Sequence, residues 1–355
     1  MGQLHSALGG ALLIGGLVAG AAWYARFSDR GPPPQVFFSA ASPPENDSLP
    51  LRFGRLEWGT DGEMTLLSYG CTSDLGLTLC DVPQNARRIV ADAGLGAVSA
   101  ARLSADGRHV LMATQTGALW WIDSNSPDSR VQLAELPPTQ LFRSLAISAS
   151  SEWIAAGSTA GAIQICGPAQ AGSVGHRIEA GSGVVDVQFS RDGLRLGSAH
   201  SDGSVRVWEV ATGKSVAEFA GHDRGALAAA FLPDGERIIS AGADDTLRMW
   251  DITSGNELRR QEAEFLGARS LAVSADGLLA AWGGHDHCIV VWDIDRDGSK
   301  FEIFTTASSV SHLHFSPDGS LLAAVETDAE KSVRLYDMQH GNLVRRISME
   351  GEDIP

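Results

Sequence analysis

The sequence contains little cysteine and little lysine. Its four cysteines lie far apart and form no Cys-x-x-Cys pair, so a disulfide framework or a structural zinc site is not expected. Lysine occurs three times in 355 residues, and 43 acidic residues outnumber 27 basic ones, which gives a net charge of -16. Because nucleic-acid phosphates attract positively charged surfaces, we expect no nucleic-acid partner.

The motifs that mark common catalytic sites are also absent from the sequence. There is no Walker A loop, no Gly-x-Ser-x-Gly turn and no His-Glu-x-x-His helix. The segment His285-Asp286-His287-Cys288 has metal-binding residue types, but neighbouring residues of an extended chain point to opposite sides. We therefore predict a chain that is not an enzyme and that has no catalytic residue, no metal and no cofactor.

Near the N-terminus, residues 7–25 form an uncharged apolar run of nineteen residues. This length is close to the ~20 residues that a helix needs to cross a bilayer. Trp23 and Tyr24 close the run with the aromatic residues typical of a membrane interface. We predict a transmembrane helix within residues 1–26 and a single-pass membrane protein. A cleaved signal peptide is the alternative, although the first six residues lack the usual lysine or arginine.

The charges that flank this run favour one orientation. Arg26 and Arg30 follow the apolar residues, and basic residues concentrate on the cytoplasmic side of membrane helices. The rest of the chain is therefore expected in the cytoplasm, with export to a periplasm or to the outside of the cell as the alternative. Small residues at four-residue spacing (Ala11, Gly15 and Ala19) are typical of helices that pair within the membrane, which indicates self-association.

A proline-rich linker follows over residues 27–51. Six of the fourteen prolines lie in this segment, and proline disfavours both helices and sheet pairing. An extended spacer between the membrane and the remaining chain is therefore predicted. The apolar stretch Val36–Phe38 is a candidate for one added strand on the domain that follows.

Beyond the linker, the dipeptide Asp-Gly recurs at a nearly constant interval. It begins at residues 61, 106, 192, 234, 276 and 318, and Ser150-Ser151 takes its place in one further copy, so that the last four intervals are 42 residues each. Because Asp-Gly favours hairpin turns and alternating apolar residues flank it, each copy is predicted to form four short strands. Seven copies occupy residues 52–349, and residues 350–355 form a C-terminal tail.

These copies resemble the WD-repeat family of β-propellers. The aromatic-acidic pairs Trp208-Glu209, Trp250-Asp251, Trp292-Asp293 and Tyr336-Asp337 carry the resemblance, together with Gly221-His222. The resemblance implies an all-β fold, a seven-bladed propeller of four-stranded blades. In the first three copies, Cys80, Trp121 and Cys166 are placed at the aromatic position. The ring is expected to close either by packing alone or with a strand from residues 36–39.

The resemblance also implies a structural hydrogen-bond set inside the fifth blade, formed by His222, Ser240, Asp244 and Trp250. The fourth copy has Ala180 at the histidine position, so its set is expected to be eroded. Eroded blades would then depend on apolar packing, because losing a whole buried polar set costs little, whereas losing one member costs more.

By the same resemblance, one rim of the propeller is expected to bind proteins or peptides. The matching positions are His200, Asp223, Arg224, Asp245 and His287. The function that this implies is a non-catalytic, membrane-tethered scaffold for protein–protein interaction, and the acidic net charge favours partners with basic segments.

A second group of polar residues is predicted where the ring closes. Arg55 and Glu57 of the first copy match His312 and His314 of the seventh in strand position, and Arg102 is their counterpart in the second copy. This seam cluster is expected to fix which blades meet. The alternative is a small-ligand or enzymatic site in the central channel, formed by the same residues.

Overall fold

The Ser-x-Asp-Gly turns and the alternating apolar residues do produce short antiparallel strands. The computed structural model describes residues 51–58, 64–70, 77–81, 86–91, 93–137, 139–167, 175–262, 270–284, 287–296, 299–305, 309–326 and 332–348. All of them belong to a compact unit that spans residues 49–355. The predicted membrane helix, the tail and all of the linker except Leu51 lie outside the described residues.

The strands pair into seven antiparallel sheets of four consecutive strands each, here called blades 1 to 7. One short 3-10 helix, η2 (Ala93–Leu95), precedes blade 2. No helix among the described residues has the length and apolar character needed to cross a membrane. The strands are β1 (Leu51–Trp58), β2 (Met64–Gly70), β3 (Leu77–Asp81) and β4 (Ala86–Ala91) in blade 1; β5 (Val98–Leu103), β6 (His109–Thr114), β7 (Ala118–Asp123) and β8 (Ser126–Glu135) in blade 2; β9 (Phe142–Ile147), β10 (Ile154–Ser158), β11 (Ala162–Cys166) and β12 (His176–Glu179) in blade 3; β13 (Val184–Phe189), β14 (Arg195–His200), β15 (Ser204–Glu209) and β16 (Ser215–Ala220) in blade 4; β17 (Ala226–Phe231), β18 (Arg237–Gly242), β19 (Thr246–Asp251) and β20 (Glu257–Glu262) in blade 5; β21 (Ser270–Val273), β22 (Leu279–Gly283), β23 (Cys288–Asp293) and β24 (Ser299–Phe304) in blade 6; β25 (Val310–Phe315), β26 (Leu321–Glu326), β27 (Ser332–Asp337) and β28 (Leu343–Ser348) in blade 7.

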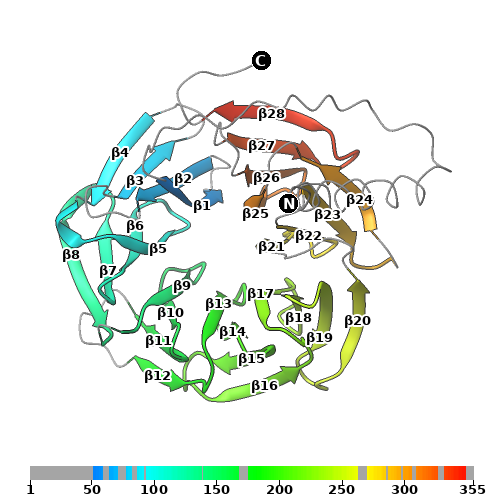
Figure 1. Ribbon diagram of the computed structural model, residues 1–355, viewed down its shortest axis with the longest axis horizontal. Coiled ribbons are helices and arrows are strands. Elements are labelled where there is room, and N and C mark those ends of the chain that lie inside the picture. Colours follow the sequence, from blue (N-terminus) through cyan, green and yellow to red (C-terminus); the bar gives the residue numbers. More distant parts are fainter. Residues whose placement is uncertain are drawn as a thin grey trace, which may run out of the picture. The chain divides into compact units, whose positions relative to one another are not determined.

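The seven blades surround a common centre (Figure 1). The first strand of each blade lies innermost and the fourth lies on the circumference, and each innermost strand packs against its counterparts in the two adjacent blades. The prediction of seven four-stranded copies is confirmed, and the arrangement is consistent with a seven-bladed propeller.

Blades 7 and 1 close this ring through direct packing, because β1 contacts β25 and β26. The outer strand of blade 7 is its own β28, and among the described strands each sheet is continuous in sequence, so no strand is exchanged between blades. Residues 36–39, the other candidate for ring closure, lie outside the described residues.

The repeated Ser-x-Asp-Gly motif forms the turn between the first two strands of a blade. In blade 4 the Ser190 hydroxyl donates to Asp192 Oδ1 over 2.6 Å, and the same carboxylate oxygen accepts the Leu194 N–H over 3.0 Å. Gly193 then adopts φ of 72°, in the left-handed region that glycine tolerates best. In blade 3, Ser151 replaces that glycine and takes the same conformation with φ of 59°.

Apolar side chains between adjacent blades form the core. The inner strands of a blade are covered on both faces, so most of their residues are buried whichever way they point. Ile239 and Met249 of blade 5, for example, share one cluster with Trp282 and Trp292 of blade 6. Burying one large side chain of this kind contributes roughly 1.5–3 kcal/mol, so the interfaces between blades stabilise the ring as a whole.

The predicted place of Trp121 is wrong. In blade 5, Trp250 at the aromatic position of β19 lies opposite Ile238 on β18. The matching pair in blade 2 is Ile122 on β7 opposite Val110 on β6. Ile122 therefore occupies the aromatic position. Trp121 points to the opposite face of the sheet and stacks on His109, with ring centroids 4.9 Å apart.

Candidate functional site

A chain of buried hydrogen bonds runs through blade 5. His222 comes from the loop before β17, and its Nδ1 lies 2.9 Å from Asp244 Oδ1 while its Nε2 lies 2.8 Å from Ser240 Oγ. The Trp250 indole N–H donates to the same serine oxygen over 2.9 Å. A carboxylate only accepts hydrogen bonds, so Nδ1 carries the proton and Nε2 accepts the Ser240 hydroxyl. The structure thus joins the four predicted residues in one network.

Charged groups extend this network toward the rim. Arg248 donates to Asp244 Oδ2 over 3.2 Å and to Glu257 Oε2 over 3.1 Å. Burial alone would raise the pKa of Asp244, but hydrogen bonds from His222 and Thr246 hold it well below its usual range. Burial lowers the pKa of His222, so the imidazole is neutral at pH 7 and the carboxylate is charged.

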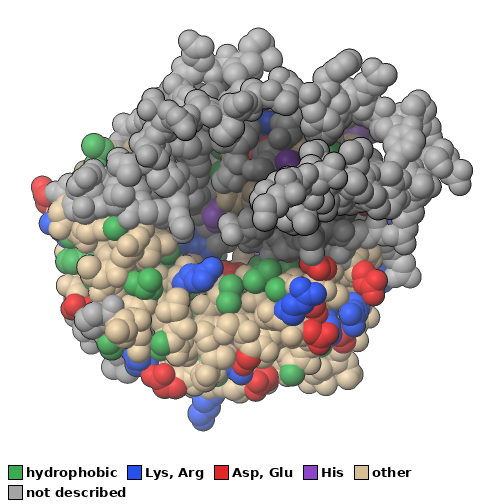
Figure 2. Space-filling model, viewed as in Figure 1, with side chains coloured by type: hydrophobic (Ala, Val, Ile, Leu, Met, Phe, Trp, Pro, Cys, Tyr) green, Lys and Arg blue, Asp and Glu red, His purple; other side chains and the backbone are tan. Residues whose placement is uncertain are grey.

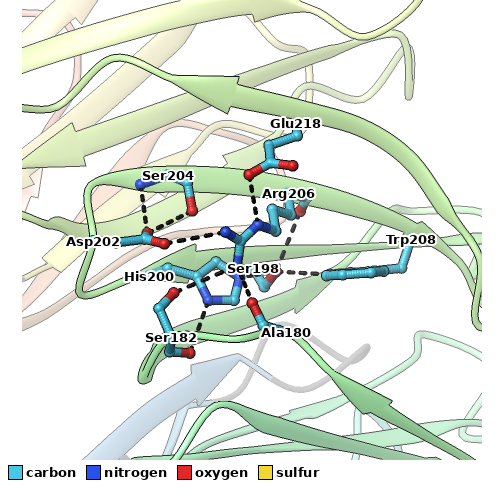
Figure 3. A network of polar contacts seen from close by, with 9 residues as sticks. All are labelled: Ala180, Ser182, Ser198, His200, Asp202, Ser204, Arg206, Trp208 and Glu218. Carbon is cyan, nitrogen blue, oxygen red and sulfur yellow. Dashed lines mark hydrogen bonds and ion pairs between the residues drawn. The ribbon is translucent and has the colours of Figure 1, made fainter.

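Blade 4 contains an equivalent network in which the histidine comes from a different strand (Figure 3). His200, the last residue of β14, is fully buried and its Nε2 lies 2.7 Å from Ser198 Oγ. Trp208 donates to that oxygen over 2.8 Å, and His200 Nδ1 lies 3.3 Å from the Ser182 carbonyl oxygen. Ala180 does stand at the usual histidine position, but the prediction that blade 4 has an eroded polar set is wrong because His200 completes it. The prediction that His200 is an exposed rim residue is also wrong.

In blades 4 and 5 the same site receives a histidine from two different positions of the repeat. Ala226 pairs with Gly242 in blade 5 just as Val184 pairs with His200 in blade 4, so Gly242 and His200 are equivalent. A Cβ atom on Gly242 would lie 2.1 Å from His222 Nδ1. The imidazole of one position thus fills the space of the other, which explains why blade 4 combines His200 with Ala180 and blade 5 combines Gly242 with His222.

An arginine on the third strand supports the blade 4 network from the rim side. Arg206 donates to Asp202 over 3.1 Å, to Glu218 over 3.0 Å and to the carbonyl oxygen of Ala180. Ala180 stands before blade 4 at the position that His222 has before blade 5. Arg206 therefore fixes the inter-blade loop even though no histidine side chain extends from it (Figure 3).

Blade 7 fills the same site with a carboxylate. Glu326 pairs with Val310, which is the register position of His200 and Gly242. It is fully buried, accepts the Tyr336 hydroxyl over 2.8 Å and forms a 2.7 Å ion pair with Arg334. Burial and the charge of Glu326 raise the pKa of Tyr336, so the phenol keeps its proton. Blade 6 has Trp282 instead of the serine, and the Trp292 indole N–H has no partner among the described residues.

The remaining predicted rim residues lie in loops above these networks. Asp223 and Arg224 are exposed, and the Asp223 N–H donates to Asp244 Oδ2 over 3.2 Å. Asp245 and His287 occupy the loop between the second and third strands with φ of 60° and 56°. Glycine takes this conformation at the matching position of blades 2 to 4, so blades 5 and 6 place polar side chains where those three blades have none.

The predicted seam residues lie on the innermost strands of blades 7, 1 and 2. Arg55 and Glu57 lie on β1, next to the strand β25 that carries His312 and His314, but the structure does not describe their side chains. Arg102 is buried, and its Nε donates to the Leu145 carbonyl oxygen over 2.6 Å. That nitrogen thus joins blade 2 to blade 3.

Other polar contacts between innermost strands follow the same logic. Ser144 of blade 3 accepts the Val187 N–H over 3.0 Å and donates to Asp186 over 2.9 Å, and Ser270 accepts the Leu313 N–H over 2.9 Å. These bonds connect consecutive blades. Among the residues that the structure describes, no group of three or more His, Cys, Asp or Glu side chains is arranged to hold a metal ion.

The buried histidine of blade 4 should make stability depend on pH. Burial, together with the charge of Arg206, lowers the pKa of His200 to about 4, whereas an unfolded histidine titrates near 6.5. The unfolded chain therefore binds a proton more readily than the folded chain, and stability falls as pH falls from about 6.5 to 4. Between pH 7 and pH 5 this residue should contribute a loss of about 2 kcal/mol.

Urea denaturation of the wild-type chain and of His200→Gln at the two pH values measures this loss. Glutamine retains hydrogen-bonding groups and does not titrate, so the variant should lose about 2 kcal/mol less than the wild type. Equal losses in the two proteins would contradict a depressed pKa at His200.

Comparison with known proteins identifies repeats at the blades described above. The family model of the WD domain, G-beta repeat, matches residues 172–209, 213–251 and 299–337. No curated protein matched the chain. Each matching segment contains the outer strand of one blade and the first three strands of the next, and the three segments include the polar sites of blades 4, 5 and 7. The chain therefore contains WD repeats, consistent with a WD-repeat propeller.

Proposed function

We propose that the protein is a non-catalytic, membrane-tethered scaffold that binds other proteins through the rim loops of blades 4 to 6. The observation that supports this most is the network beneath those loops. His222 and Asp244 hold the loops from below, while Asp223 and Arg224 point to solvent above them. WD repeats are typical of protein-interaction scaffolds, and binding residues concentrate on loops that a rigid framework positions.

The charges of the molecule favour a polar partner surface. On the described part of the face in Figure 2, basic and acidic side chains are interspersed, and no block of one sign covers it. The chain as a whole has a net charge of -16. A partner with basic segments would be attracted from a distance, while the opposite charges of the adjacent residues Asp223 and Arg224 would select its orientation at the rim.

The membrane tether rests on the sequence of residues 7–25. The apolar run has the length of a membrane helix, and Arg26 and Arg30 after it favour a cytoplasmic location for the blades. Protease added to intact cells tests this orientation. Cleavage of the blades from outside would show that the protein is exported.

Affinity capture of the full-length chain from detergent-solubilised membranes tests the binding function. The variant Asp223→Ala/Arg224→Ala should recover roughly tenfold less of the co-purifying protein, as expected for loss of central contacts of an interface. Asp128→Ala/Arg130→Ala is the matched control, since it removes one acid and one base that are exposed on β8 of blade 2. Equal recovery with both variants, or a small molecule in place of a protein, would overturn the proposal.

A further inference from the structure

Five of the innermost strands carry one extra residue at their second position. In blades 2, 3, 4, 5 and 7 the register of the first strand against the second shifts at the same place. β-bulges of this kind are frequent next to active sites, where they re-aim a side chain. The extra residues, in blade order, are Ser99, Arg143, Val185, Leu227 and Ser311. In blades 1 and 6 the matching side chains lie outside the described residues.

The bulge residues fall into two kinds. In blades 2 and 7 the hydroxyls of Ser99 and Ser311 donate to main-chain carbonyl oxygens over 3.0 Å and 3.2 Å, so these side chains are used inside the ring. The three consecutive blades 3, 4 and 5 have Arg143, Val185 and Leu227 in their place, and we call these three residues the bulge triad.

The bulge triad presents side chains to solvent. Arg143 is exposed, and no residue that the structure describes forms an ion pair or a hydrogen bond with its side chain. Val185 and Leu227 are partly exposed, although the residues before them, Val184 and Ala226, are 1% and 0% exposed. An arginine without a partner beside two aliphatic side chains is complementary to a carboxylate that has an aliphatic neighbour.

Hydrogen bonds next to the bulge triad fix its three strands to one another. The Ser144 hydroxyl donates to Asp186 Oδ1 over 2.9 Å, and Asp186 Oδ2 accepts the Ala229 N–H over 3.4 Å. Each of these residues follows a member of the triad by one or two positions. The strands β9, β13 and β17 pack side by side around the centre of the ring (Figure 1). The triad is therefore held in place before a partner arrives, which lowers the entropy cost of binding.

We propose that the bulge triad binds an Asp or Glu side chain of the partner together with the aliphatic side chain beside it. Arg143 forms paired hydrogen bonds with the carboxylate, and the aliphatic side chain packs on Val185 and Leu227. Leu227 lies three residues after Arg224, so the triad adjoins the partner-binding rim.

This inference rests on the proposed function and adds the sequence class of the partner segment. The chain has a net charge of -16, which disfavours a segment that is acidic throughout. The segment that fits therefore has one acidic residue and an aliphatic neighbour among neutral or basic residues.

Selection of random peptides displayed on phage, with the full-length chain in detergent as the target, tests this assignment. The wild-type chain should recover peptides in which Asp or Glu stands next to Leu, Ile or Val. Arg143→Glu should recover peptides with Lys or Arg at that place, because the reversed charge reverses the preference. Arg130→Glu is the matched control, since it reverses another exposed arginine, on β8 of blade 2, and should recover the same peptides as the wild type.

The affinity of one recovered peptide gives the size of the effect. Arg143→Glu should weaken its binding at least about tenfold, as expected for a contact that dominates an interface. Arg143→Lys keeps the charge but loses the paired geometry, so it should weaken binding less. Peptides without an acidic residue, recovery of no peptide, or equal binding to the wild type and to Arg143→Glu would overturn the proposal.

Partner capture separates this inference from the proposed function. If capture depends on Asp223 and Arg224 while peptide selection does not depend on Arg143, the proposed function stands and the bulge triad is not a binding site. If peptides depend on Arg143 but no protein co-purifies with the full-length chain, the proposed function fails and the triad remains a peptide site.

Discussion

Replacing Asp244 by alanine is expected to lower the free energy of unfolding by about 3–5 kcal/mol, the cost of removing one partner from a buried ion pair. The side chain of Asp244 is 7% exposed, and it accepts hydrogen bonds from His222, Thr246 and Arg248 and from the Asp223 N–H. Without it, the Arg248 guanidinium keeps a single carboxylate partner, and the His222 N–H loses its carboxylate acceptor and keeps only Thr246 Oγ1 nearby. Urea denaturation monitored by tryptophan fluorescence measures the loss.

Asp202→Ala is the matched control for this substitution. Asp202 occupies the same position in blade 4 and also binds an arginine, but its side chain is 40% exposed. Water can replace the lost partner there, so the expected cost is about 1 kcal/mol or less. Equal costs for the two variants would contradict the view that burial of the blade 5 network makes it stabilising.

Placing histidine at Gly242 should be similarly destabilising, unless His222 is removed at the same time. A Cβ on Gly242 would lie 2.1 Å from His222 Nδ1 and 2.2 Å from Asp244 Oδ1, which is closer than non-bonded heavy atoms approach. The expected cost of Gly242→His is about 3 kcal/mol or more, as for strong overpacking of a core. His222→Ala alone should cost about 1–3 kcal/mol, because it leaves Ser240 with a lost partner.

The double variant His222→Ala/Gly242→His rebuilds the arrangement of blade 4 inside blade 5. Its cost should be at least about 2 kcal/mol less than the sum of the single costs, since one imidazole again fills one site. Combining His222→Ala with Gly235→Ala is the control. Gly235 lies in a distant hairpin turn with open space around it, so these two costs should add. An additive result for the histidine exchange would show that the two positions do not share a site.

The sequence was sufficient for the blades because their turns depend on local chemistry. Ser-x-Asp-Gly forms its own hydrogen bonds within a few residues, so the motif marks blades 2, 4, 6 and 7 directly. The polar network of blade 5 could be predicted for a similar reason, since its four residues stand at the positions that the WD-repeat resemblance implies.

The sequence does not predict the network of blade 4, because the position of His200 along the chain does not show where its side chain points. His200 stands near a loop and was expected in solvent, but it is buried between Ser198 and Ser182. The sequence does contain a signal. Blade 4 has Ser198 and Trp208 without the usual histidine, and His200 stands one repeat of 42 residues before Gly242, the glycine at the matching position of blade 5. In β7, the adjacent residues Trp120 and Trp121 likewise suggest an aromatic position that lies one residue before the true one, Ile122.

Contacts between blades were not predictable from the repeat. Arg102 matches His314 in strand position, yet its Nε binds the Leu145 carbonyl oxygen of the next blade. Which neighbour a long side chain reaches depends on the packing of two sheets, and a pattern within one repeat contains no information about that choice.

Amide exchange in the rim loops tests most directly the claim that buried networks hold these loops rigid. The Asp223 N–H binds Asp244, and the Ala243 N–H binds the Gly225 carbonyl oxygen over 2.9 Å. Both amides should exchange slowly in the wild-type chain at neutral pH and at least about tenfold faster in His222→Ala. Fast exchange of both amides in the wild-type chain would contradict the claim, because the rim would then present no fixed surface to a partner.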